Sequence, residues 1–364
     1  MSENKLTCLH DRHVALGALM SPFGGFDMPI QYKGIVEEHN AVRNAVGVFD
    51  VSHMGEVHIT GPEAQKFVNY IFTNDITKMD KGGIQYGMML YPNGGTVDDL
   101  LVYTMGENDY FLVINAANID KDVAWINEQA QNFDVKVDNQ SENYGQIAVQ
   151  GPDAEKTMKA VLNIDCSDLT FYTFKVIDYN GDSIIVSRTG YTGEDGFEVC
   201  ASHKTIQDMW DMLMTAGVQP CGLGCRDTLR FEVGLPLYGD ELTADITPIM
   251  AGFGFFVKLD KEDFIGKDAC AKQKAEGAPK KLVGLELHDK AIPRHGYEVC
   301  NENNEPIGYV TTGYRGISVD KSIAVALVDA AWGKLGTPLK VHIRKKYFDA
   351  TVVKKKFHDK SYKK

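Results

Sequence analysis

The feature that most constrains the fold is an internal repeat in the N-terminal half of the chain. Residues 59–72 (ITGPEAQKFVNYIF) and 149–162 (VQGPDAEKTMKAVL) each read as the end of a strand, a Gly-Pro turn and an amphipathic helix. We expect Pro62 and Pro152 at the first helical position, each followed by an acid that complements the helix dipole. Because a solenoid needs three or more copies, two copies about 90 residues apart predict paired α+β subdomains.

The segments around the repeats alternate between strand and helix patterns. Strands are expected at residues 100–105 and 110–115, in DVKVDN and QIAVQ, and in a hairpin of KVIDYN and SIIVSR. Helices are expected at residues 118–132 and around Ile206, Trp210 and Leu213. This order is typical of split β-α-β units, with ferredoxin-like and related antiparallel sheets covered by helices.

The length of the chain and a change of pattern near residue 280 predict the domain organisation. A chain of 364 residues exceeds what one hydrophobic core usually organises. Residues 268–280 lose strand patterning, and from Lys281 on the chain is a series of short β-rich runs, which is typical of a small all-β barrel. We therefore expect two interleaved α+β subdomains in residues 1–280 and a β-barrel with a basic tail in residues 281–364.

Composition and charge exclude several classes of protein. The net charge of −12 would repel a phosphate backbone, so nucleic acid is not an expected partner. The sequence has neither an apolar run of about 20 residues nor an apolar N-terminal signal segment, so we expect no membrane contact and no signal peptide. The seven cysteines are odd in number and scattered, and Cys221 and Cys225 alone are a weak metal signal. These features indicate free thiols, no metal and a cytoplasmic protein.

The C-terminal residues 344–364 form a basic patch on this acidic chain. They hold nine Lys or Arg against two Asp, a net charge of +7. One interpretation is a solvated terminus. The other is a landing site for an anionic ligand tail or an acidic partner, to which Lys354, Lys355 and Lys356 would contribute.

The segment NGGTVDDLLVY, residues 93–103, places two carboxylates at the start of an apolar strand. Burying charge there is costly unless it is used or paired. Neighbouring strand residues point to opposite faces, so Asp98 and Asp99 cannot both enter one pocket and at most one is catalytic. The alternative is that both carboxylates cap the turn and strand backbone.

Two further segments are candidates for ligand contact. SRTGYTGEDGFEV, residues 187–199, has three glycines in seven residues, which favours close approach to a ligand; the alternative is a glycine-rich hairpin with Glu198 on the surface. CGLGCRDTLRFE, residues 221–232, leads from a turn into a short helix on which Arg226 and Arg230 share a face. These arginines either form a structural salt-bridge network or bind a carboxylate or carbonyl oxygen.

FDVSHMGE, residues 49–56, contains Asp50, Ser52 and His53, but the cluster is too local to form a catalytic triad. A turn with a hydrogen-bonded histidine is the expectation. The motifs of metalloproteases, α/β-hydrolases, P-loop NTPases and Rossmann dinucleotide-binding proteins are all missing.

These segments in order, together with VINAAN at 113–118, QGPDA and LYGDEL at 237–242, resemble the aminomethyltransferases, the T-proteins of the glycine cleavage system. The resemblance runs from about residue 6 to the C-terminus. It implies a three-domain cloverleaf around a central folate channel. It also implies transfer of the methylene carbon of an aminomethyl group, carried on the dihydrolipoyl arm of the lipoylated H-protein, to tetrahydrofolate. The products are 5,10-methylenetetrahydrofolate and ammonia.

The resemblance also implies roles for particular residues. Asp99, the second Asp of the motif, would be the catalytic carboxylate. The residues expected to contact the folate are Tyr86, Tyr103, Asn115, Tyr191, Glu198, Arg226 and, in the tail, Tyr362. The chain departs from the family pattern at Phe26 and Phe255, where tryptophan is usual.

Two alternatives remain. One is a different folate-dependent demethylase of the same superfamily; the missing dinucleotide fingerprint argues against the enzymes with an attached flavin domain and leaves a free-standing demethylase subunit open. The other is a non-catalytic folate-binding module, whose K-G-C-Y-x-G-Q-E-type motif is replaced here by FIGKDACAKQK at 264–274.

Overall fold

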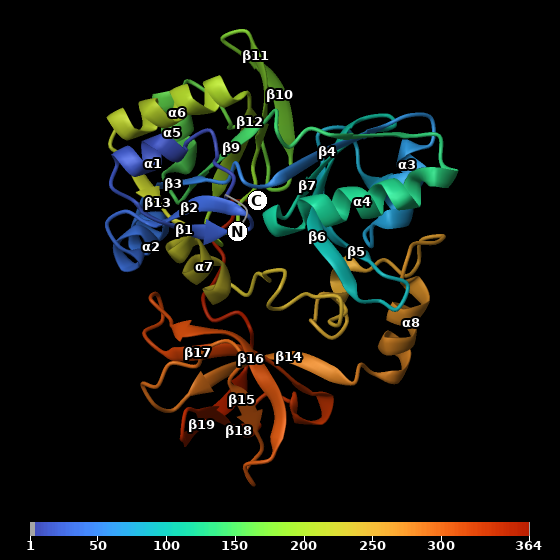
Figure 1. The fold of residues 1–364 in the computed structure, drawn as a ribbon, viewed down its shortest axis with the longest axis vertical. Coiled ribbons are helices and arrows are strands. Elements are labelled where there is room, and N and C mark those ends of the chain that lie inside the picture. Colours follow the sequence, from blue (N-terminus) through green and yellow to red (C-terminus); the bar gives the residue numbers. More distant parts are fainter. Residues whose placement is uncertain (1–3, 364) are drawn as a thin grey trace.

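The computed structural model describes residues 4–363 and has three lobes that meet at the centre of the molecule (Figure 1). The first two lobes are α+β and the third is a β-barrel. The predicted cloverleaf of two α+β units and a barrel is therefore confirmed.

The first lobe is built on a six-stranded sheet in the order β10-β11-β12-β9-β3-β13. Its strands are β3 (Gly47–Asp50), β9 (Gly145–Gln150), β10 (Phe174–Tyr179), β11 (Asp182–Ser187), β12 (Gly196–Ala201) and β13 (Gln219–Cys221). Its helices are α1 (His10–Ala15), α2 (Ile35–Asn44), α5 (Ala154–Leu162), α6 (His203–Thr215) and α7 (Leu223–Glu232), and the hairpin of β1 (Leu19–Phe23) and β2 (Phe26–Gln31) lies beside them.

The second lobe is built on a five-stranded sheet in the order β5-β6-β7-β4-β8. Its strands are β4 (Gly55–Thr60), β5 (Ile84–Leu90), β6 (Thr96–Gly106), β7 (Asp109–Ile114) and β8 (Lys136–Asn139). Its α-helices are α3 (Ala64–Ile71) and α4 (Ile119–Gln129), and its 3-10 turns are η1 (Ile76–Lys78), η2 (Ala116–Asn118) and η3 (Ala130–Asn132).

The repeat seen in the sequence is a repeat of topology. The second lobe runs β4-α3-β5-β6-β7-α4-β8, and the first lobe runs β9-α5-β10-β11-β12-α6-β13. In both sheets the first strand of the unit pairs antiparallel with the fourth, and β3 is inserted beside β9 in the first lobe. The paired α+β units are therefore confirmed, and the chain leaves the first lobe after β3 and returns to it at β9.

The two helices of the repeat begin later than expected. Helices α3 and α5 start at Ala64 and Ala154, whose N–H groups donate to the carbonyls of Gly61 and Gly151 at 2.9 Å. Each proline therefore occupies the second position of a tight turn, where its fixed φ angle is favourable, and the helix begins after that turn.

The third lobe is a closed barrel in the order β14-β17-β16-β15-β18-β19. Its strands are β14 (Lys280–Leu287), β15 (Glu298–Cys300), β16 (Pro306–Arg315), β17 (Ser322–Asp329), β18 (Pro338–Ile343) and β19 (Lys346–Val353), with η5 (Ala330–Trp332) after β17. The short strand β15 was not predicted. The connection from α7 to the barrel contains η4 (Gly254–Phe256) and α8 (Lys267–Glu276), so the Ala- and Lys-rich segment before residue 280 is a helix.

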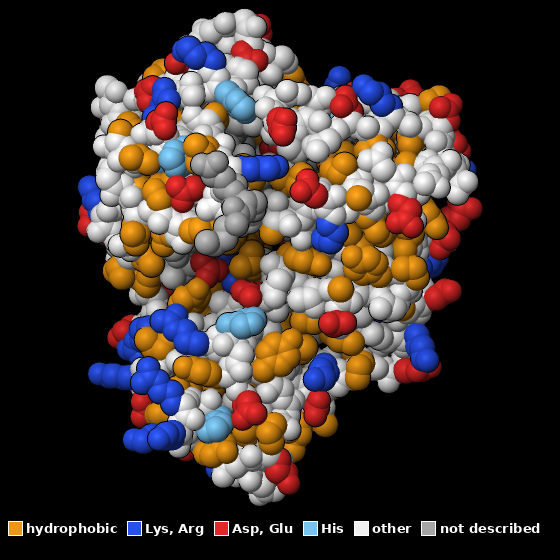
Figure 2. Space-filling model, viewed as in Figure 1, with side chains coloured by type: hydrophobic (Ala, Val, Ile, Leu, Met, Phe, Trp, Pro, Cys, Tyr) orange, Lys and Arg blue, Asp and Glu red, His pale blue; other side chains and the backbone are white. Residues whose placement is uncertain are grey.

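Apolar packing fixes the lobes and joins them. Helix α6 buries Ile206, Met209, Trp210 and Leu213 against the first sheet, at the helical spacing predicted for it. A further apolar cluster, which includes Tyr103, lies between the two sheets. Side chains of this kind gather along the band where the upper lobes meet the barrel (Figure 2). Among residues 4–363, no helix has the length and apolar character that a membrane crossing requires.

Candidate active site

A cavity of about 480 Å³ lies where the lobes meet. Its walls come from both upper lobes, from the connection after α7 and from the C-terminal tail. The lining residues that the sequence singled out are Tyr86, Asp99, Asn115, Tyr191, Glu198, Arg226 and Tyr362. The volume is in the range of sites that enclose a small molecule, and the walls combine aromatic rings with a few charged groups.

One polar group of the cavity centres on Asp99 of β6. The hydroxyl of Tyr86 donates to Asp99 Oδ2 at 2.8 Å, and Asn115 Nδ2 donates to Asp99 Oδ1 at 3.0 Å. Burial, and then the neighbouring Asp98, raise the pKa of Asp99 to about 7. A carboxyl group with such a pKa exchanges a proton readily at neutral pH, which suits acid–base chemistry.

Asp98 points away from the cavity, as strand alternation predicts. It is fully buried and accepts hydrogen bonds from Asn115 N at 3.0 Å, Asn115 Nδ2 at 2.8 Å and Asn118 Nδ2 at 2.7 Å. Asp98 therefore holds Asn115, which in turn contacts Asp99, so the two acids have different positions and are linked by one amide.

A second polar group of the cavity contains Glu198 of β12 and Arg226 of α7. Thr189 Oγ1 donates to Glu198 Oε2 at 2.5 Å, and Gln146 Nε2 donates to Oε1 at 3.4 Å. Burial raises the pKa of Glu198, against the opposing effects of the Thr189 hydrogen bond and the Arg226 charge. This carboxylate retains free acceptor capacity towards the cavity.

Arg226 is a partly buried cation that the protein leaves incompletely bonded. Its guanidinium lies 4.8 Å from the centroid of the Tyr191 ring, and Nη1 has no hydrogen-bond partner among residues 4–363. Burial lowers the pKa of Arg226, and the charge of Glu198 opposes that shift. An unpartnered buried donor is costly, so this atom is available to a ligand oxygen.

Tyr103 is the one predicted residue that the cavity does not reach. It is 1% exposed, and its hydroxyl donates to Ser187 Oγ at 3.2 Å. Ser187 Oγ lies 2.8 Å from the Thr189 hydroxyl that bonds Glu198. Tyr103 therefore lies behind the wall of the cavity and supports the hydroxyls that hold Glu198.

Comparison with known proteins agrees with this geometry. The profile of the GCVT N-terminal domain matches residues 9–261, and that of the glycine cleavage T-protein C-terminal barrel domain matches residues 280–359. The chain belongs to the glycine cleavage T-protein family. Members of this family are aminomethyltransferases, so the chain is an enzyme of that class and the aminomethyltransferase interpretation is favoured over the two alternatives.

Relatives cover the T-protein sequence from end to end. The aminomethyltransferase of Alkaliphilus oremlandii is 48% identical over 369 residues, covering 100% of both chains. The aminomethyltransferase of Bacillus subtilis is 49% identical over 360 residues, covering 97% of this chain and 99% of its own. The crystal structure of the aminomethyltransferase T of Bartonella henselae superimposes with a TM-score of 0.95 at 30% identity over 100% of both chains.

His53 is a cavity residue that the sequence interpretation missed. The expectation of a hydrogen-bonded histidine was wrong, because His53 Nδ1 is buried without a partner among the described residues and the ring lines the cavity. Burial, and then the charge of Arg226, lower the pKa of His53 to about 4, so the imidazole is neutral. The aromatic contact with Phe23, centroids 5.8 Å apart, could not be read from the local motif.

The neighbouring Asp50 does not contact His53. Its carboxylate lies 2.8 Å from His13 Nε2, so no catalytic triad forms.

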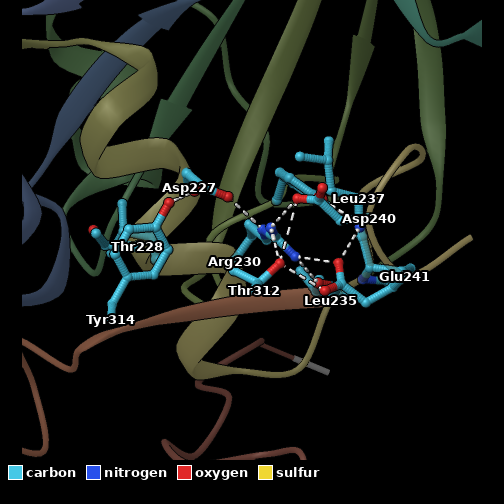
Figure 3. A network of polar contacts seen from close by, with 12 residues as sticks. Asp227, Thr228, Arg230, Leu235, Leu237, Asp240, Glu241, Thr312 and Tyr314 are labelled. Atoms are coloured by element: carbon cyan, nitrogen blue, oxygen red, sulfur yellow. Dashed lines mark hydrogen bonds and ion pairs between the residues drawn. The ribbon is translucent and has the colours of Figure 1, made fainter. Parts of the chain in front are cut away.

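Arg230 forms the structural salt-bridge network that was one of the two interpretations of residues 221–232 (Figure 3). Its Nη1 donates to Glu241 Oε2 at 2.7 Å and its Nε to Asp227 Oδ1 at 2.7 Å, while Nη2 donates to Thr312 Oγ1 of the barrel at 3.2 Å. Tyr314 of the barrel donates to Asp227. The network fastens α7 to the barrel of this T-protein and leaves Arg226 to the cavity.

The basic tail is exposed along much of its length but is anchored near its end. After β19 it returns to the centre of the T-protein, where Ser361 N donates to Gly193 O at 2.7 Å and the Tyr362 ring stacks on Phe171 with centroids 4.1 Å apart (Figure 1). Lys355 donates to the carbonyl of Ala251, so its charge is not available to a ligand.

Cys221 and Cys225 lie with Glu38 in the one group of His, Cys, Asp and Glu side chains that could hold a metal within residues 4–363. Both Glu38 oxygens are already occupied, because they accept backbone N–H groups of residues 32, 33, 34 and 222. Burial raises the pKa of Cys225 well above its usual value, which disfavours the thiolate that a metal requires. These contacts suit a structural carboxylate that organises the start of α7.

Proposed function

We propose that this chain transfers the methylene carbon of an aminomethyl group from the dihydrolipoyl arm of the lipoylated H-protein to tetrahydrofolate. The arm is left as a free thiol, and the products are 5,10-methylenetetrahydrofolate and ammonia. The observation that carries the proposal is the cavity, which combines aromatic walls, a carboxylate with free acceptor capacity and a second carboxyl group whose pKa is raised to about 7.

The chemistry of Glu198 and Arg226 matches a reduced pterin ring. An aminopyrimidinone carries adjacent N–H donors and a carbonyl oxygen, and a carboxylate beside a guanidinium complements both. Glu198 would accept from the ring N–H groups, and the free Nη1 of Arg226 would donate to an oxygen. Tyr191, already stacked with Arg226, and Tyr86 supply aromatic surface for the ring system.

Asp99 would act where the carbon is transferred. Two C–N bonds to the folate nitrogens form as the C–S bond and the C–N bond to the departing ammonia break, and the two protons from the folate nitrogens end on the thiol and on ammonia. In between, the methylene carbon passes through a cationic, iminium-like state, which an ionised carboxylate stabilises in a partly buried site. The same group accepts the proton that leaves the folate nitrogen. Tyr86 and Asn115 hold both Asp99 oxygens and so fix the direction of the carboxyl group.

We further propose that residues 1–280 are the folate-binding region and that the barrel of residues 281–364 closes the cavity with its tail.

We also propose that the protein works in the reducing cytoplasm. The seven cysteines, all within the described residues, are free thiols, which supports this location.

A reconstituted reaction tests the proposed function. Purified protein is mixed with aminomethylated H-protein and tetrahydrofolate, and ammonia and methylenetetrahydrofolate are followed together. We expect both products in equal amounts, and only when folate is present. Folate binding without turnover on this carrier would contradict the transfer reaction and favour the demethylase or the binding module.

One lysine of the tail is placed to attract the anionic glutamate chain of folate. Lys360 lines the cavity, is exposed, and makes no ion pair within residues 4–363. Its Nζ lies 5.7 Å from the centroid of the Tyr362 ring. Lys356, by contrast, pairs with Asp359 at 2.7 Å. We therefore assign attraction of the glutamate chain of folate to Lys360 rather than to residues 354–356.

For Lys360→Gln we expect the KM for tetrahydrofolate triglutamate to rise about 3- to 5-fold at low salt, the size of an exposed ion pair, with kcat unchanged. The effect should shrink for the monoglutamate and at high salt, because screening weakens exposed pairs. Lys354→Gln, another exposed tail lysine, is the matched control. Equal KM values for Lys360→Gln and the control would exclude this contact.

A further inference from the structure

Behind Asp99 the T-protein buries two more carboxyl groups. Asp98 of β6 and Asp122 of α4 are both fully buried. Asp122 faces the start of β6, because Lys121 Nζ donates both to Asp122 Oδ1 and to the carbonyl oxygen of Val97, and Asn118 Nδ2, one turn earlier, donates to Asp98 Oδ1 at 2.7 Å. Two carboxylates that are buried side by side cannot both be ionised without a large cost, so a proton between them is expected.

The contacts of Asp122 show where a proton is needed. Its Oδ1 accepts from Lys121 Nζ at 2.8 Å. Its Oδ2 is buried and has no hydrogen-bond donor among residues 4–363. A proton on Oδ2, donated to Asp98, satisfies that atom and removes the repulsion in one step.

The contacts of Asp98 indicate which of the two acids carries the negative charge. Its oxygens accept three N–H groups, two from Asn115 and one from Asn118. Three donors favour the ionised form of an acid. The Lys121 side chain is 35% exposed, so water screens its charge. Burial, and then the charge of Asp98, raise the pKa of Asp122 to about 10.

We propose that Asp98 and Asp122 share one proton, held by Asp122, and that the charged Asp98 is a positioning residue that fixes Asn115 and sets the acid–base state of Asp99. Asp98 acts through its neighbours, since it does not touch the cavity. Its negative charge opposes ionisation of Asp99 and so keeps the pKa of Asp99 near neutral pH, where the carboxylate can accept a proton and release it again. The part of this inference that concerns turnover rests on the proposed role of Asp99.

The other titratable groups described around the three acids do not take over the influence of Asp98 on the protonation of Asp99. Lys121 faces Asp122 from α4 and lies 4.8 Å from the ring centroid of Tyr238, whose hydroxyl donates to Thr96 O. On the cavity side, the tyrosines that face Asp99 are Tyr86, Tyr172 and Tyr191, whose pKa values burial raises, so they stay neutral.

Asp122→Asn separates the shared proton from an ordinary Lys121–Asp122 ion pair. The asparagine can accept from Lys121 with its oxygen and donate to Asp98 with its nitrogen, so it reproduces the protonated acid. We expect the pH profile of kcat/KM to remain within error of the unmodified protein. The melting temperature should rise at neutral pH, because unfolding releases the proton that folded Asp122 holds and the asparagine has no such proton to release. If Asp122 were ionised, the substitution would remove a charge beside Asp98, lower the melting temperature and shift the acid limb of the profile. Either change overturns the proposal.

Asp98→Asn removes the charge that faces Asp99. We expect the acid limb of the kcat/KM profile to move down by about one pH unit, because a like charge has been removed. A purely structural role would lower activity at every pH without moving the limb, and that result overturns the positioning role.

Infrared difference spectroscopy tests the shared proton without turnover, so its outcome is independent of the proposed function. The spectrum of unmodified protein minus Asp122→Asn is recorded above pH 8, where Asp99 is ionised. We expect the carbonyl band of a protonated carboxyl group, shifted in heavy water; bands from Glu56, whose pKa burial also raises, cancel in the difference. If no such band appears, the shared proton is disproved.

Discussion

Replacing Asp99 by Asn should slow transfer by orders of magnitude while making the folded protein more stable. The amide keeps the shape of the side chain, so the hydrogen bonds with Tyr86 and Asn115 can rearrange without a cavity. It cannot take up a proton or carry a negative charge beside a cationic carbon. We expect kcat to fall about 10²- to 10⁴-fold, the usual share of a positioned acid–base group, with the Kd for tetrahydrofolate changed less than about 3-fold.

The stability gain follows from the raised pKa of Asp99, about 7 in the folded protein against about 3.9 in an unfolded chain. Between these values the folded state holds a proton that the unfolded state has released, so this group favours folding below pH 4 and the advantage is lost as the pH rises to 7. Three pKa units correspond to about 4 kcal/mol. Asp99→Asn, which never ionises, should therefore be the more stable form above pH 7 and equal to the unmodified protein near pH 4.

Denaturant unfolding at several pH values measures this difference, with the exposed Asp245→Asn as the matched control. The control should show neither the loss of kcat nor the pH-dependent gain in the free energy of unfolding. A variant that turns over at near-normal rates with unchanged folate binding would remove Asp99 from the mechanism.

Patterns within short segments of the sequence predicted most of the fold, because turns, helix starts and the alternation of a strand depend on neighbouring residues. The Gly-Pro turn followed by an amphipathic helix appears twice in the sequence, and it appears twice in space as β4-α3 and β9-α5. The alternation of Asp98 and Asp99 across β6 likewise depends only on the pleat of a strand. Strand β15, three residues long, has no pattern of its own and pairs only because β16 and β18 lie on either side of it.

The parts of the site that escaped prediction depend on contacts between distant segments. His53 reaches the cavity because β1 and α7 are folded against it, and no spacing within residues 49–56 encodes that. Tyr103 matched a family motif, yet the packing of the two sheets turns it behind Glu198. The contacts that place Asp122 beside β6 join this strand to a helix 24 residues away from Asp98, and no local pattern encodes them.

Glu198→Gln should produce the largest loss of folate affinity of any single substitution in the cavity. The glutamine places an N–H donor where the ring presents N–H donors, so an acceptor is lost and a donor–donor clash is introduced. Thr189 can still donate to the remaining oxygen, which preserves the local fold. Losing charge-assisted hydrogen bonds at a buried site costs about 3 kcal/mol, or about 10²-fold in Kd.

Calorimetry or fluorescence titration with tetrahydrofolate measures this change, and the exposed Glu276→Gln is the matched control. We expect kcat at saturating folate to fall much less than affinity, because in the proposed function Glu198 binds the ring and Asp99 acts on the transferred carbon. The variant also leaves Arg226 without the carboxylate that opposes its burial, so its melting temperature should fall. Folate binding within about 3-fold of the unmodified protein would mean that the pterin ring lies elsewhere in the cavity, and it would reverse the orientation of folate on which the assignment of Lys360 depends.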